Sequence, residues 1–98
     1  MPSRFLFFKT SCPACLEYLR IIPMLNLRLS REKQITLIDG LQLELFGVTN
    51  YPILKEFDPR LFNSYPLLYL DGSVIKGFVL AQQLKILLER FFKDDFIY

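Results

Sequence analysis

Two cysteines separated by two residues are the side chains in this sequence with the clearest capacity for chemistry. Cys12 and Cys15 enclose Pro13 and Ala14, and the 98-residue chain has no other cysteine. Pro13 favours the first position of a helix, where its missing N–H is not needed. A thiolate is the reactive form of cysteine, and the positive end of a helix stabilises it. We therefore expect Cys12 to be a nucleophile and Cys15, about one turn further on, to be the resolving thiol.

Two other interpretations of the cysteine pair remain open at this point. A structural zinc site needs four ligands, and the chain has no His and no second cysteine pair, although two copies could share one ion. The cysteines could also be two inert small side chains in a helix. With a shared metal ion or a structural disulfide at the cysteines, the chain would be a binding module without enzymatic activity. Their position between a predicted strand and a predicted helix favours redox chemistry. Lys9, three residues before Cys12, would then add positive charge near the thiolate.

The first half of the chain predicts a strand, a helix and a second strand. Residues 4–8 form a short, continuous apolar run, which suits a strand covered on both faces. The helix that begins at the cysteine motif carries apolar residues at helical spacing: Leu16, Leu19 and Ile22. Pro23 either ends this helix or kinks it. Residues 34–39 alternate and include β-branched side chains, so they predict a strand that Gly40 ends.

The pattern of residues 41–62 is the least clear in the chain. Residues 41–45 alternate like a strand, yet each residue type there also tolerates a helix. Residues 52–57 resemble a short helix that closes before Pro59. We therefore assign only that short helix to this part of the chain.

The last third of the chain predicts a β-hairpin followed by a helix. Residues 66–70 and 73–76 are the two strands, and the Asp-Gly pair between them is a strong hairpin signal. Gly77 ends the second strand. Residues 78–93 then predict a helix whose apolar stripe consists of Leu80, Leu84, Leu87, Leu88 and Phe91.

These elements predict an α/β fold with the order β-α-β-(α)-β-β-α. The first two strands are joined by a helix, so we expect them to be parallel with a right-handed crossover. The last two strands form an antiparallel hairpin. Because residues 4–8 are apolar throughout, helices must cover both faces of the sheet. The prediction is a mixed four-stranded sheet flanked by helices, in one domain that covers residues 1–98.

Composition and charge limit the partners that we expect. Apolar residues make up 52% of the chain and charged residues 22%, which suits one compact soluble domain. The net charge is +2, and Glu32 interrupts the only basic cluster (Arg28, Arg31, Lys33), so a solvated surface is favoured over a nucleic-acid site. No apolar run approaches the roughly 20 residues that span a bilayer. The N-terminal apolar run, residues 5–8, is too short for a signal peptide. We expect a cytoplasmic monomer that binds neither membrane nor nucleic acid.

Residues 8–15 resemble the active-site segment of glutaredoxins, in which a lysine precedes Cys-Pro-x-Cys by the same interval. The run Ser-Tyr65-Pro66, followed by a hairpin, is similar to the cis-proline loop of the thioredoxin superfamily. Gly77 falls where that fold has a turn before its last helix. The resemblance implies a thioredoxin fold and a glutaredoxin-like thiol–disulfide oxidoreductase, with the element order β-α-β-α-β-β-α.

The resemblance also implies roles for individual residues. Pro66 would be cis and face the Cys12 sulfur, and the backbone of Tyr65 would pair with an extended substrate or with glutathione. The expected substrate-binding set is Lys9, Pro13, Tyr65, Pro66 and Gly77. The substrates would be proteins or small molecules that contain a disulfide. The electron donor would be glutathione or a thioredoxin-reductase-type protein, and no bound cofactor is implied.

The chain departs from both families at several positions. Ala14 stands where glutaredoxins carry an aromatic residue. The sequence Ser-Tyr-Pro occupies the place where glutaredoxins usually have Thr-Val-Pro. The residues after Gly77 are apolar, whereas glutaredoxins have polar residues there that bind the charged ends of glutathione. Thioredoxins have a Trp before the motif and a buried Asp on an early strand, but this chain has no Trp and no acidic residue before Glu17. Disulfide exchange is the activity we expect, with glutathione left open as a co-substrate.

Overall fold

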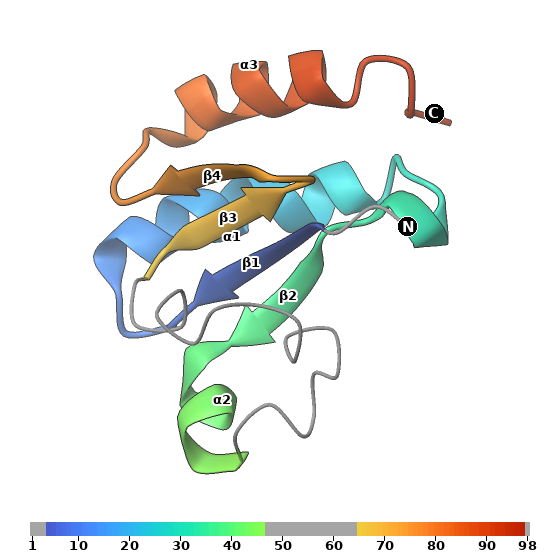
Figure 1. Cartoon of the computed structure of the whole chain (residues 1–98). Coiled ribbons are helices and arrows are strands. Elements are labelled where there is room, and N and C mark those ends of the chain that lie inside the picture. Colours follow the sequence, from blue (N-terminus) through green and yellow to red (C-terminus); the bar gives the residue numbers. More distant parts are fainter. Residues whose placement is uncertain (1–3, 47–64, 98) are drawn as a thin grey trace.

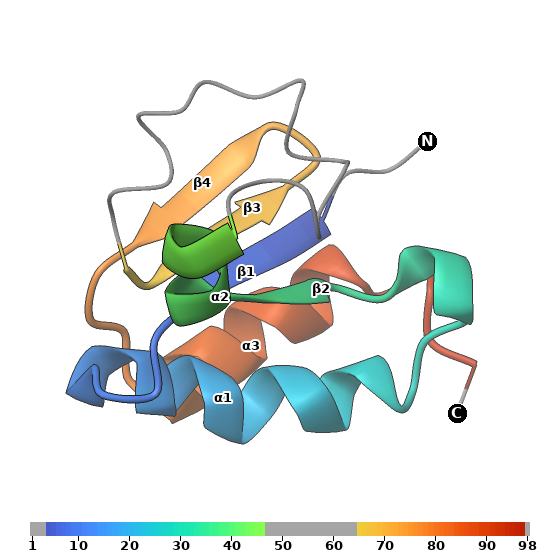
Figure 2. The ribbon, with the colours of Figure 1, turned by 90° about the horizontal axis from the view of Figure 1, so that it is seen from below.

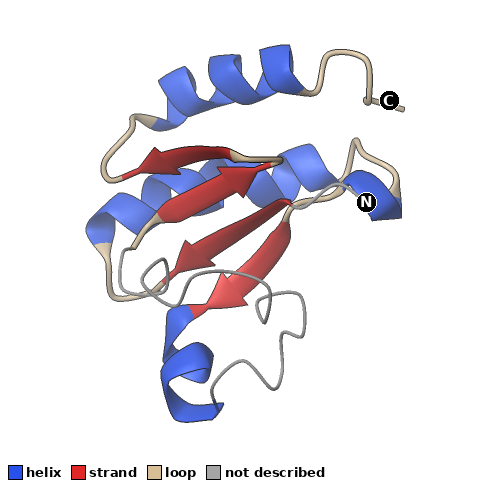
Figure 3. Ribbon diagram, viewed as in Figure 1, coloured by secondary structure: helices blue, strands red, loops and turns tan. Residues whose placement is uncertain are grey.

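The computed structural model describes residues 4–46 and 65–97, in which helices pack against one β-sheet (Figure 1). The elements in chain order are β1 (Arg4–Phe8), α1 (Pro13–Asn26), a 3-10 turn (Arg31–Lys33), β2 (Thr36–Asp39), α2 (Gly40–Phe46), β3 (Leu67–Leu70), β4 (Ser73–Lys76) and α3 (Ala81–Phe91). The strands of this part of the chain form a four-stranded mixed sheet flanked by helices (Figure 3). The predicted α/β class is confirmed, while the helix predicted at 52–57 lies outside the described residues.

The sheet has the strand order β2-β1-β3-β4, which puts β1 in an interior position. β1 runs parallel to β2, with Phe7 opposite Ile38, and antiparallel to β3, with Phe7 opposite Leu67. β3 and β4 form a hairpin whose turn is Asp71-Gly72, and both turn residues have a positive φ (50° and 105°). The predicted parallel first pair and the predicted hairpin are both confirmed.

Side chains of β1 alternate between two hydrophobic cores, one on each face of the sheet. Leu6 packs in the core beneath α1 and α3, which lie side by side on one face (Figure 2). Phe5 and Phe7 belong to the second core, together with Ile38 of β2 and Leu43 of α2. These three β1 side chains are completely buried. A strand covered on both faces needs apolar residues at successive positions, which explains the unbroken apolar run.

α1 continues past Pro23 and ends at Asn26, so the proline does not end the helix. A proline in a helix interior costs about 3 kcal/mol because it removes a backbone hydrogen bond and crowds the preceding turn. Burial of Tyr18 and Ile22 against the sheet offsets this cost. The Asn26 side chain then ties the end of α1 to Ile35, donating to its carbonyl oxygen (2.9 Å) and accepting from its N–H (2.8 Å).

The buried face of α1 is rotated from the predicted one. The sequence pattern placed Leu16 and Leu19 on the apolar stripe, but Leu16 is 45% exposed. The buried residues of the helix are Cys15, Tyr18, Ile22 and Leu25. Their spacing is helical, as expected, but the stripe starts at Cys15 and Tyr18, each one residue before the predicted positions 16 and 19.

Residues 41–45 form part of a helix, α2, although their alternation also allowed a strand. Gly40 ends β2 as predicted and is also the first residue of α2. The carboxylate of Asp39 accepts a hydrogen bond from the N–H of Leu41 (2.9 Å). It thereby satisfies one of the free donors at the start of the helix. Leu43 is buried and anchors α2 to the core. It belongs to the run of residues 41–45, whose pattern fits a helix and a strand equally well.

α3 is shorter than predicted and buries a different stripe. It spans 81–91 instead of 78–93. Leu84 and Leu88 are buried as predicted, and Phe92, just beyond the helix, completes the stripe. The other predicted stripe residues are 40–49% exposed: Leu80, Leu87 and Phe91. The first of these has an extended backbone and precedes the helix as its N-cap, so it cannot share the helical stripe. Across residues 4–46 and 65–97, no helix combines the length and apolar character that crossing a membrane requires.

Candidate functional site

β1 leads directly into α1 (Figure 1), and the cysteine pair lies at this junction, as the sequence predicts. Cys12 is the N-cap residue of α1, with an extended backbone (φ −95°, ψ 116°), and Pro13 is the first helical residue. The N–H of Cys12 donates to the carbonyl oxygen of Lys9 (3.1 Å) and closes the turn after β1. The N–H of Cys15 donates to the carbonyl oxygen of Cys12 (3.1 Å) and to its sulfur (3.3 Å). The sulfur of Cys12 therefore caps the helix, a role usually taken by a side-chain oxygen.

The two thiols differ in exposure and in pKa. Cys12 is partly exposed, whereas Cys15 has no exposed surface. The pKa of Cys12 is lowered by a hydrogen bond from the Cys15 thiol and by the backbone N–H groups of Cys15 and Ala14. Burial raises the pKa of Cys15 to about 11, against the opposing effect of the Lys9 N–H, which donates to the Cys15 sulfur (3.4 Å). Negative charge is therefore held on Cys12, the thiol that solvent can reach.

Replacing Cys15 by alanine is expected to raise the pKa of Cys12, because the thiolate loses a hydrogen-bond donor. Cys15→Ser is the matched control, since a hydroxyl can still donate to the Cys12 sulfur. Each variant retains a single thiol, so the pH dependence of iodoacetamide alkylation reports on Cys12 alone. The alkylation midpoint should move to higher pH in Cys15→Ala and stay closer to the wild-type midpoint in Cys15→Ser. Identical midpoints in all three proteins would show that the Cys15 side chain does not tune Cys12.

Lys9 connects the cysteine pair to a neighbouring cluster of side chains. Its ammonium group forms an ion pair with Glu44 of α2 and lies 4.9 Å from the centre of the Tyr65 ring. The hydrogen bond to Glu44 raises the pKa of Lys9. The sequence predicted that this charge would act near Cys12, and the structure shows in addition that it lowers the pKa of Cys15. Glu44 was not identified from the sequence, because the pattern there did not distinguish a helix from a strand.

The peptide bond between Tyr65 and Pro66 is cis, as the resemblance to the thioredoxin superfamily implied. The antiparallel register of β1 and β3 reaches Phe7 opposite Leu67. If this register is extended by two positions beyond the strands, Tyr65 comes opposite Lys9. The Lys9 ammonium does lie over the Tyr65 ring, in agreement with this extension. Since the backbone of Lys9 bonds to both cysteines, the Tyr65–Pro66 segment lies at the end of the sheet that carries the cysteine pair.

Gly40 provides the space that the Tyr65 ring occupies. A Cβ atom at residue 40 would lie 2.5 Å from Cε1 of Tyr65 and 2.9 Å from Cγ of Lys9, closer than carbon atoms normally approach. We expect Gly40→Ala to displace the ring and to lower the free energy of unfolding by about 1–2 kcal/mol, after allowing for the better helix propensity of alanine.

Urea denaturation of Gly40→Ala, Tyr65→Ala and the double variant measures this contact. If the two sites touch, the Gly40 substitution should cost much less once the Tyr65 ring has been removed. Strictly additive losses in the double variant would contradict the contact.

Gly77 uses both of its backbone polar groups inside the molecule. Its φ of +74° lies in the left-handed region that favours glycine. Its N–H donates to the carbonyl oxygen of Pro66 (3.2 Å), and its carbonyl oxygen accepts a hydrogen bond from the Tyr18 hydroxyl (2.8 Å). The sequence predicted Gly77 as a substrate contact, and the structure adds these two internal bonds. Tyr18 was missed, because no local pattern signals a hydroxyl that meets a carbonyl 59 residues away.

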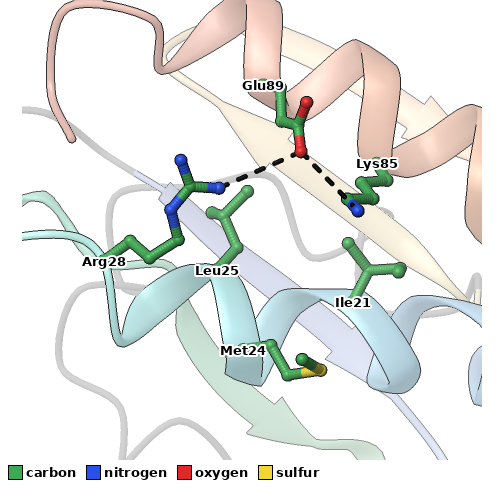
Figure 4. Close-up of a pocket in the computed structure, with 6 residues that line it drawn as sticks. All are labelled: Ile21, Met24, Leu25, Arg28, Lys85 and Glu89. Atoms are coloured by element: carbon green, nitrogen blue, oxygen red, sulfur yellow. Dashed lines mark ion pairs between the residues drawn. The ribbon is translucent and has the colours of Figure 1, made fainter. Parts of the chain in front are cut away.

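A hollow lies apart from the cysteine pair, between the C-terminal half of α1 and α3 (Figure 4). Its volume is about 200 Å³, and its lining residues are Ile21, Met24, Leu25, Arg28, Lys85 and Glu89. Glu89 bridges Arg28 (3.9 Å) and Lys85 (4.0 Å) across its rim. None of the predicted site residues lines this hollow.

No family model, curated protein or solved structure matches this chain. In the part of the chain that the structure describes, no three His, Cys, Asp or Glu side chains are grouped so that they could hold a metal ion. The cysteine pair offers two sulfur ligands, fewer than the four of a structural zinc site. Its geometry instead suits nucleophilic sulfur chemistry: one reachable thiol with a lowered pKa and a second, protonated thiol directly behind it.

Proposed function

We propose that this chain is a thiol–disulfide oxidoreductase of the thioredoxin fold, similar to glutaredoxins, which reduces disulfides through Cys12 and Cys15. The observation that carries the proposal is the asymmetry of the pair. Cys12 is partly exposed, caps a helix and has a lowered pKa, whereas Cys15 is buried with a pKa of about 11. A lowered pKa increases the thiolate fraction near neutral pH, and a neighbouring thiol allows the second exchange step.

The proposed reaction consists of two exchange steps. The Cys12 thiolate attacks one sulfur of a substrate disulfide, so that a new S–S bond forms while the substrate bond breaks and its leaving thiolate takes up a proton. Cys15 then loses its proton and attacks the Cys12 sulfur, which releases the second substrate thiol. The substrate gains two electrons and two protons, and the chain is left with a Cys12–Cys15 disulfide. Glutathione or a thioredoxin-reductase-type donor returns that disulfide to the dithiol.

The surroundings of the pair support disulfide-containing proteins as the substrate class. The Tyr65–Pro66 segment lies at the same end of the sheet as the cysteines, where its backbone could pair with an extended peptide. A βαβ unit followed by a hairpin and a helix is the order that the thioredoxin fold requires. The cytoplasm suits this activity, because a reducing compartment keeps both cysteines available as thiols.

The test is the reduction of insulin by dithiothreitol in the presence and absence of the chain. We expect the reduction rate to increase in proportion to the amount of chain added. A rate no higher than that of dithiothreitol alone would reject protein-disulfide reduction. Parallel assays with glutathione and a small disulfide, and a measurement of bound zinc, would then separate a glutathione-specific enzyme from a binding module that holds a shared metal ion.

A further inference from the structure

The Tyr65–Pro66 segment is held in place by a backbone hydrogen bond from Gly77. Proline has no N–H, so Pro66 cannot donate a hydrogen bond to the neighbouring strand. Its carbonyl oxygen, however, accepts the N–H of Gly77 at 3.2 Å. The residue that fixes Pro66 is therefore Gly77, at the end of the hairpin formed by β3 and β4.

Gly77 is in turn fixed by α1. Its carbonyl oxygen accepts a hydrogen bond from the Tyr18 hydroxyl at 2.8 Å, and Tyr18 is fully buried. Tyr18 follows Cys15 by three residues, so both side chains lie on the same face of the helix. A continuous chain of bonds thus runs from the helix that carries the cysteines, through Tyr18 and Gly77, to the carbonyl of Pro66.

We infer that Tyr18 is a positioning residue: through Gly77 it holds the Tyr65–Pro66 segment at a fixed position relative to the cysteine pair. The inference rests on the proposed function, because that segment matters only if it meets a substrate. Tyr18 touches neither the substrate disulfide nor the reacting sulfur in this role. It fixes the distance between the surface that receives the peptide and the thiol that attacks it.

The chemical environment of Tyr18 suits a permanent donor. Burial raises the pKa of its hydroxyl to about 12. The hydroxyl therefore remains protonated at every pH at which Cys12 changes from thiol to thiolate. The bond to the Gly77 carbonyl should persist throughout the working range of the cysteine pair.

Tyr18→Phe removes this one hydrogen bond and retains the buried ring. The KM for insulin should rise about two- to tenfold, which is the factor that a typical net hydrogen bond contributes. The value of kcat and the alkylation midpoint of Cys12 should stay close to wild type. Amide hydrogen exchange at Gly77 should accelerate by a similar factor, because the donor to Pro66 is less firmly held. Tyr69→Phe removes a phenolic hydroxyl elsewhere and is the matched control.

Gly77→Ala tests the same chain of bonds from its other end, should Tyr18→Phe fold poorly. A Cβ at residue 77 meets no atom of the described residues within 4 Å, so we expect the substitution to act through its positive φ. Gly72→Ala is the matched control: residue 72 also has a positive φ, and a Cβ there meets nothing within 4 Å in the described ranges, but it lies in the hairpin turn. We expect Gly77→Ala to raise the KM and Gly72→Ala to leave it unchanged.

The outcomes separate this inference from the proposed function. A faster Gly77 exchange together with a raised KM supports the inference. An unchanged KM in Tyr18→Phe overturns it, whatever happens to exchange, and so does a raised KM with unchanged Gly77 exchange. If the wild-type chain reduces no disulfide at all, the proposed function fails by itself. The role of Tyr18 in catalysis falls with it, while the exchange rates still report whether Tyr18 holds Gly77.

Discussion

Cys12→Ser is expected to abolish catalysed disulfide reduction and leave only the rate of dithiothreitol alone. The serine hydroxyl does not ionise near neutral pH and forms no exchangeable bond with sulfur, so the first step cannot occur. The loss should exceed that of any other single substitution at the site, because the remaining residues position or resolve but do not attack. Insulin reduction, measured under identical conditions for the variant and the wild type, checks this expectation.

The fold should survive this substitution, which makes the result easy to interpret. Cys12 is the N-cap of α1, and serine is among the residues most favoured at that position. Urea denaturation should therefore give Cys12→Ser a free energy of unfolding at or near the wild-type value. Activity that persists in a correctly folded Cys12→Ser protein would show that this residue is not the nucleophile.

Phe5→Ala is expected to cause the largest loss of stability, about 3–5 kcal/mol in the free energy of unfolding. Phe5 is completely buried in β1. Its ring stacks on Tyr69 (4.8 Å between centroids, 7° between planes) and contacts Phe7 at 5.1 Å. Alanine would leave a cavity at the centre of the core that α2 covers. A domain of this size has a total free energy of unfolding of about 5–15 kcal/mol, so the substitution should remove a large share of it.

Phe5→Leu is the matched control, because it retains most of the apolar volume and should cost less than Phe5→Ala. Urea denaturation at fixed pH measures both variants, with the midpoint and the slope compared separately. A loss below about 1 kcal/mol for Phe5→Ala would mean that the second core collapses around the cavity or contributes little to stability.

Patterns confined to one element could be predicted from the sequence. The continuous apolar run of β1 and the Asp71-Gly72 turn are local signals, and both predicted elements form as expected. The position of Cys12 at the start of α1 follows from the proline after it. The cis bond before Pro66 was inferred from a resemblance and could not have been inferred from propensity, because few such bonds are cis.

Contacts between distant elements could not be predicted. Tyr18 was not identified from the sequence, because nothing near it along the chain reveals the carbonyl of Gly77. Glu44 was missed because residues 41–45 fit a strand and a helix equally well, and only Asp39 and the burial of Leu43 decide between them. These residues determine how the site is held together, whereas the cysteine motif determines its chemistry.

The most direct test of the proposed mechanism is to trap its intermediate. Cys15→Ser should react with a peptide disulfide and stop at the mixed disulfide, because no resolving thiol remains. Intact-mass measurement followed by peptide mapping should find one peptide per chain, attached to Cys12 and released by dithiothreitol. A folded Cys15→Ser protein that forms no adduct, while its Cys12 still reacts with iodoacetamide, would contradict thiol–disulfide exchange as the activity of this chain.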